Sequence, residues 1–126
     1  MIQIVDVLLY RCSVVFLIGT TKEEWKKFFE KEKPKVTEAD YVNVIDELDS
    51  GSLGALLGTE GGDYICYISD PTNQGLCVHE IFHAAHSILW DRLYRGDEGS
   101  EPTAYLIEFL YNQFLAILNN RKNRKK

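Results

Sequence analysis

The segment from His79 to His83 constrains this chain more than any other, because it places His-Glu-x-x-His inside an apolar run typical of a helix. On a helix, residues four positions apart lie on the same face, so His79 and His83 can direct two imidazoles at one metal ion. Glu80 lies about 100° round the same helix, close enough to act on a water molecule that the metal activates. The pattern therefore predicts a zinc site with two histidine ligands and a glutamate general base.

The helix predicted over residues 74–92 divides into an apolar arc and a polar arc at 100° per residue. The apolar arc is expected to face the core and contains Cys77, Val78, Ile81, Phe82, Ala85, Ile88 and Leu89. The polar arc is unusually rich in histidine and contains His79, Glu80, His83, His86, Ser87 and Trp90. The alternative interpretation is an ordinary surface helix whose histidines are merely exposed.

The composition is that of a single domain with an acidic body. The chain has 126 residues, of which 45% are hydrophobic and 26% charged, as in ordinary globular proteins. Five basic residues gather at the C-terminal end, and without them the net charge falls from −5 to −10. We therefore predict one domain over 1–120 and a basic, solvated tail over 121–126, and the acidic body argues against general nucleic-acid binding.

Cysteine spacing and hydropathy indicate a cytoplasmic protein that does not enter a membrane. Cys12, Cys66 and Cys77 show neither metal-binding nor disulfide spacing, which indicates free thiols in a reducing compartment. No apolar run reaches transmembrane length, and the apolar segment 1–18 lacks the basic start and cleavage site of a signal peptide. Association with a particle assembled in the cytoplasm fits the same observations.

Hydrophobic patterns along the chain predict an α+β fold, with helices packed on one small, mainly antiparallel sheet. Two β-hairpins are expected, the second with a glycine-rich loop, built from strands over 2–9, 14–18, 53–57 and 64–69. Helices are expected over 22–33, 37–49, 74–92 and 101–119. Thr21 and Glu24 have the spacing of a capping box at the first helix.

A catalytic zinc ion usually has a third protein ligand, which the motif does not supply. His86 lies about 10.5 Å along the helix axis from His79, too far for both imidazoles to reach one ion easily. A carboxylate from the following segment is the better source, and Asp97, Glu98 and Glu101 are available. Glu101 is favoured because it opens a helix that can pack beside the motif helix and hold a ligand rigidly.

The motif followed by Glu101-Pro-Thr-Ala-Tyr105 at the start of the next helix resembles the gluzincin pattern of thermolysin-type peptidases. The short chain, with a hairpin leading into the motif, resembles the minimal zincin-like proteins encoded by bacteriophages and prophages. The metzincin pattern is excluded, because it requires a glycine and a further histidine shortly after His83, at positions that hold histidine and leucine here. The resemblance is specific only at 79–83 and 101–105.

The resemblance implies a zinc-dependent peptidase in which His79, His83 and Glu101 bind Zn²⁺ and Glu80 is the general base. Tyr105 stands where many gluzincins carry a carboxylate that orients a histidine. We predict a catalytic role for Tyr105 in stabilising the oxyanion, with Tyr94 and His86 as alternative donors.

The expected substrate is a peptide or protein that lies extended along a sheet edge, either the strand over 53–57 or that over 64–69. A competing hypothesis is a catalytically inactive phage structural or accessory protein, in which zinc stabilises the fold and Asp97 or Glu98 closes the site. A metal-free interaction module is the third.

Overall fold

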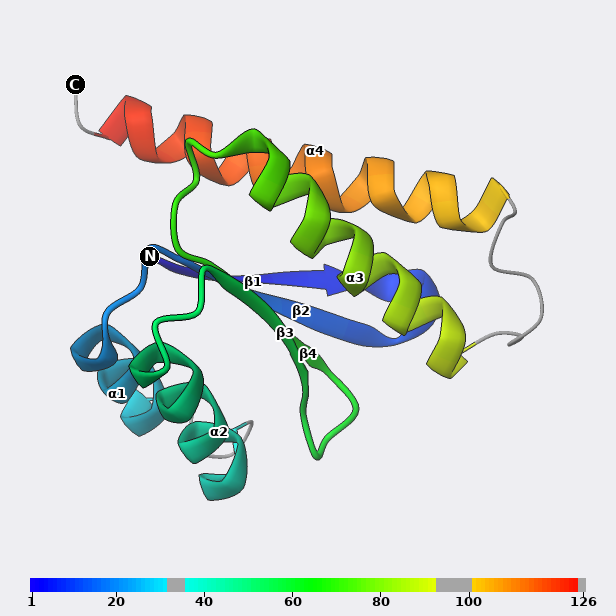
Figure 1. Cartoon of the computed structure of the whole chain (residues 1–126). Helices are drawn as coiled ribbons and strands as arrows, with labels where there is room; N and C mark the ends of the chain where they lie inside the picture. Colours follow the sequence, from blue (N-terminus) through cyan, green and yellow to red (C-terminus); the bar gives the residue numbers. More distant parts are fainter. Residues whose placement is uncertain (32–35, 93–100, 125–126) are drawn as a thin grey trace.

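Figure 1 shows the computed structural model of the chain, in which a four-stranded sheet separates two pairs of helices. The structure describes residues 1–31, 36–92 and 101–124, and of residues 101, 102 and 121–124 only the backbone. The α+β class is as predicted. In the described ranges, no helix has the length and apolar character needed to cross a membrane.

The sheet is mixed, with strand order β1-β2-β4-β3. The strands are β1 (Ile2–Val7), β2 (Cys12–Ile18), β3 (Gly54–Gly58) and β4 (Tyr64–Ile68). Both predicted hairpins are confirmed as antiparallel pairs, whereas β2 and β4 pair in parallel at the centre of the sheet. The prediction of a mainly antiparallel sheet missed this parallel pair, which the long connection between β2 and β4 allows. In this strand order β3 lies at one edge of the sheet.

The first strand is shorter than predicted. It ends at Val7, because residues 8–10 form a 3₁₀ turn in which Arg11 N donates to Leu8 O over 3.2 Å. Arg11 closes the turn with φ 53°, in the left-handed region. The apolar Leu8 and Leu9 in this turn are more than 80% exposed, so they do not continue the strand pattern into the core.

The helices begin within one residue of the predicted positions, and the first three begin next to capping side chains. They are α1 (Lys22–Lys31), α2 (Glu38–Asp49), α3 (Gln74–Arg92) and α4 (Glu101–Arg124). The capping box is confirmed, because Glu24 N donates to Thr21 Oγ1 over 3.2 Å and Thr21 N donates to Glu24 Oε1 over 3.1 Å. Asn73 Oδ1 accepts from Leu76 N over 3.1 Å and caps α3.

Two helix ends differ from the prediction or fall outside what is described. The fourth helix continues to Arg124, so the segment predicted as a tail begins inside a helix. The end predicted for the first helix lies among residues 32–35, outside the described residues.

The core is divided by β2, whose alternating side chains are buried on both faces of the sheet. Val14, Phe16 and Ile18 face the layer formed by α3 and α4. Val15 and Leu17 face the layer formed by α1 and α2. The sequence of β2 is an almost continuous apolar run because helices cover both faces of the sheet at this strand. The motif helix α3 is thus fixed on one face of the sheet (Figure 1).

The C-terminal end of α3 is fastened to the sheet by polar contacts. The buried Tyr64 hydroxyl donates to Asp91 Oδ2 and lies 3.3 Å from the Ser87 carbonyl oxygen. Burial and the adjacent Asp91 carboxylate raise the pKa of Tyr64, so the hydroxyl stays protonated and remains a donor. Arg92 donates to the Gly62 carbonyl in the β3–β4 loop.

We expect Tyr64→Phe to lower the free energy of unfolding by about 1–2 kcal/mol, because it removes a hydrogen bond to a charged group. Urea denaturation measures this loss. Tyr67→Phe is the matched control, since the Tyr67 hydroxyl makes no hydrogen bond with a described residue and is expected to cost little. An equal loss in both variants would contradict the role assigned to the Tyr64 hydroxyl.

Candidate metal centre

His79 and His83 lie one turn apart on α3, with their Nε2 atoms 3.1 Å apart. Their rings meet edge to face, with centroids 4.6 Å apart and an interplanar angle of 82°. Two nitrogens bound to one zinc ion at about 2.1 Å in tetrahedral geometry lie about 3.4 Å apart. The 3.1 Å separation is within hydrogen-bond distance, and it is also within a few tenths of an ångström of the spacing that two ligands of one zinc ion require.

Glu80 is buried beside this pair, with 5% of its surface exposed. Its Oε1 lies 3.9 Å from His79 Nε2, and its Oε2 makes no hydrogen bond within the described part of the chain. Burial raises the pKa of the Glu80 carboxyl, while the two histidines lower it. Buried polar atoms without a partner are rare in folded proteins and call for an explanation such as a bound ion or a catalytic role. This orphaned oxygen is the strongest structural sign of a functional site.

The buried side of α3 differs from the predicted apolar arc. It runs through Cys77, Glu80, Ile81, Ala84, Ala85, Ile88 and Leu89. Glu80, predicted on the polar arc, faces the sheet edge at β3, whereas Val78 and Phe82, predicted in the core, are 47% and 45% exposed. The arc is displaced because β3 contacts one flank of α3 and α4 covers the other only in part.

The predicted third ligand cannot be placed beside the histidines. The helix α4 begins at Glu101 as predicted, but the Glu101 side chain is outside the described residues, as are Tyr94, Asp97 and Glu98. Among the side chains that the structure describes, no group of three or more His, Cys, Asp or Glu could hold a metal ion. Glu101 as third ligand therefore stays a prediction.

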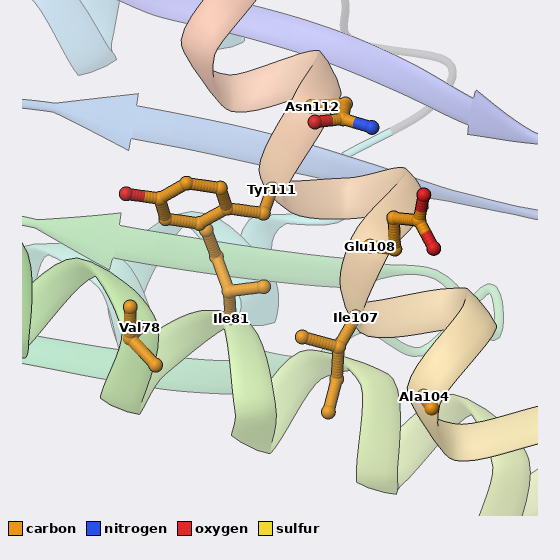
Figure 2. Close-up of a pocket in the computed structure, with 7 residues that line it drawn as sticks. All are labelled: Val78, Ile81, Ala104, Ile107, Glu108, Tyr111 and Asn112. Atoms are coloured by element: carbon orange, nitrogen blue, oxygen red, sulfur yellow. The ribbon is translucent and has the colours of Figure 1, made fainter. Parts of the chain in front are cut away.

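The helix α4 packs along α3 in the opposite direction and crosses it obliquely (Figure 1). The two helices line an apolar pocket, into which Ile107 and Tyr111 of α4 project toward Ile81 of α3 (Figure 2). Val78 completes the α3 side of this pocket, whereas His79 and His83 do not line it. The face of α3 that carries the histidines is therefore separate from its contact with α4.

Tyr105 is not placed to act with Glu80. It is 66% exposed and lines a second pocket together with the 3₁₀ turn after β1. Its neighbour Ala104 faces α3, and one residue further along a helix turns the side chain by about 100°. The position of Tyr105 beside the turn after β1 thus does not support the catalytic role that the resemblance suggested.

His86 belongs to a row of aromatic rings that reaches the histidine pair through Phe82, whose ring centroid lies 6.1 Å from that of His83. Its ring stacks between those of Phe82 and Trp90, with centroids 5.9 Å and 6.0 Å away. The expectation that His86 lies too far along the helix to be a ligand stays a prediction.

Sequence reasoning also missed two residues near Glu80. Gly54 of β3 contacts its side chain, and Glu47 of α2 raises the pKa of its carboxyl. A glycine inside an otherwise aliphatic strand was the available signal for the first, because such glycines often mark close approach of another group.

No protein-family model, curated protein or solved structure matches the chain.

Proposed function

We propose that the protein is a zincin-like, zinc-dependent peptidase. His79 and His83 would hold the zinc ion, a downstream carboxylate, predicted to be that of Glu101, would be the third ligand, and Glu80 would be the general base. The observation that carries the proposal is the buried Glu80 carboxylate, with one unpartnered oxygen, beside two imidazoles whose Nε2 atoms are 3.1 Å apart. Neutral imidazole and carboxylate are donor groups that suit zinc.

Each part of the site has a defined task in this proposal. Bound zinc would supply a Lewis acid that lowers the pKa of water to about 7 and polarises the scissile carbonyl. Glu80 would take a proton from the attacking water and return it to the leaving amine. The position of Glu80 supports this role, because its buried carboxylate lies beside the histidine pair, with Oε1 3.9 Å from His79 Nε2.

The position of β3 supports a peptide as the substrate. In the described sheet β3 pairs only with β4, so its other edge is free to pair with an extended chain, whereas β4 is paired on both sides. Of the two strands predicted to bind substrate, only β3 is therefore available. A peptide added along it would pass Gly54 and reach the Glu80 carboxylate.

The exposure of the histidines supports a catalytic site over a purely structural one. A zinc ion that only stabilises a fold is usually enclosed by four protein ligands. The side chain of His79 is 65% exposed, which leaves room for water and substrate. If the protein binds zinc but cleaves no peptide, the result would favour the competing hypothesis of an inactive accessory protein that zinc stabilises.

We expect Glu101→Ala to weaken zinc binding by about 100-fold or more, since removal of groups that merely support ligands already costs up to about 100-fold. Zinc affinity can be measured by competition with a chromophoric chelator. Asp97→Ala, Glu98→Ala and His86→Ala are the controls and are expected to bind zinc like the wild type. The assignment of the third ligand fails if Glu101→Ala binds normally while one of these controls does not.

A further inference from the structure

The Glu80 side chain lies against the backbone of β3 at Gly54. A Cβ atom at position 54 would lie 2.8 Å from Glu80 Cγ, 2.9 Å from Cδ and 3.0 Å from Oε1. Contacts under 3.0 Å essentially never occur for real Cβ atoms. The absence of a side chain at position 54 thus creates the space that the Glu80 carboxylate fills.

The requirement for glycine at this position is steric and not conformational. The glycines with positive φ in the described chain are Gly19, Gly51 and Gly62, so the backbone at Gly54 suits any residue. At the other end of the same strand, a Cβ on Gly58 would meet nothing within 4 Å. Of these two glycines of one strand, only Gly54 therefore leaves space that the Glu80 side chain occupies.

The contact restricts where Glu80 can place its charge. Glu80 is 5% exposed, and its Oε1 lies 3.9 Å from His79 Nε2. A methyl group at position 54 would have to displace the carboxylate or push β3 away from α3. Because packed interiors leave little free volume, either displacement moves the carboxylate relative to the histidines.

We propose that Gly54 is a positioning residue, which holds the Glu80 carboxylate beside the histidine pair by leaving a gap in the edge strand. The inference rests on the proposed function and adds to it a residue outside the motif. It assigns β3 a second task, since the strand that is free to pair with a peptide also sets the position of the general base.

The contact itself can be tested on metal-free protein by thermal unfolding. Gly54→Ala is expected to lower the melting temperature by about 4 °C or more in the wild-type background. The loss should vanish in the Glu80→Ala background, where the clashing atoms are gone. Gly58→Ala is the matched control and should have the same small effect in both backgrounds. An equal loss for Gly54→Ala in both backgrounds would overturn the proposal.

The positioning role is tested by kinetics on zinc-loaded protein with fluorescein-labelled casein. Gly54→Ala is expected to lower kcat about 100-fold, the cost of a misplacement of about 1 Å, with zinc affinity within about twofold of the wild type and a change in KM much smaller than the change in kcat. Gly61→Ala, in the β3–β4 loop, should behave like the wild type, because its nearest atom would be 3.9 Å from the new Cβ. A wild-type kcat in Gly54→Ala would show that Gly54 is only structural and would overturn the proposal.

The two experiments separate failure of this inference from failure of the proposed function. A wild-type protein that binds zinc but cleaves no casein would overturn the peptidase proposal and the kinetic consequence for Gly54. The coupling between Gly54 and Glu80 in metal-free protein would still decide whether the glycine holds the carboxylate.

Discussion

Glu80→Gln is expected to lower kcat for casein hydrolysis by about 10²–10⁴-fold and to leave zinc binding unchanged. An amide has the size of the carboxylate but does not accept and return a proton at neutral pH. Zinc affinity should persist because His79 and His83 are intact. Hydrolysis of labelled casein and elemental analysis of the same preparation measure both quantities.

The control must show that lost activity reflects chemistry and not unfolding. The Glu80 carboxylate is buried, and its Oε2 accepts no hydrogen bond from the described residues that glutamine would remove. The metal-free Glu80→Gln protein is therefore expected to melt no lower than the wild type. Glu38→Gln removes the same charge from an exposed position on α2 and should keep full activity. Unchanged kcat in Glu80→Gln, or a loss explained by a lower melting temperature, would contradict the role of Glu80.

Local sequence patterns were sufficient for most elements of the fold. Asn73 as the cap and the apolar period place α3 over Gln74–Arg92, the range predicted. The two hairpins follow from short connections between apolar runs. The parallel pairing of β2 with β4 could not be predicted in this way, because it joins strands separated by α1, α2 and β3 and depends on packing across the whole domain.

Only the part of the candidate site that follows from the helix period, the common face of His79 and His83, could be predicted from the sequence. The spacing of His79 and His83 fixes their common face, and the structure places their Nε2 atoms 3.1 Å apart. The burial of Glu80 could not be read from that period, because a helix projection does not show which flank contacts β3. Gly54 is 26 positions away in the sequence, and only the folded chain brings it against Glu80.

Glu80 is an exception to the rule that glutamate side chains are exposed to solvent. A buried carboxylate without a full set of partners is unfavourable for stability, and natural proteins keep such groups mainly where they have a function. Placing Glu80 on the polar arc was wrong because solvent exposure is the usual condition of a glutamate. The departure from that rule coincides with the histidine pair, which is why we assign the site to this end of β3.

Zinc binding is expected to be lost in His79→Ala and in His83→Ala, with affinity lowered by more than about 100-fold in each. Each variant removes one of two nitrogens that lie 3.1 Å apart and face the same space on α3. Elemental analysis of purified protein should show about one zinc per chain in the wild type and almost none in either variant. Full occupancy in both variants would exclude this pair as the metal site.

The same variants should separate zinc binding from folding. At a free zinc concentration 100 times its Kd, the ion stabilises a protein by about 2.7 kcal/mol, so zinc should raise the melting temperature of the wild type and chelation should reverse the rise. His79→Ala and His83→Ala are expected to melt close to metal-free wild type whether or not zinc is added. His86→Ala is the matched control, because the His86 ring stacks between those of Phe82 and Trp90, and zinc should stabilise this variant as it does the wild type. Zinc-dependent stabilisation that survives in His79→Ala but disappears in His86→Ala would move the metal site to the aromatic row and contradict the arrangement proposed here.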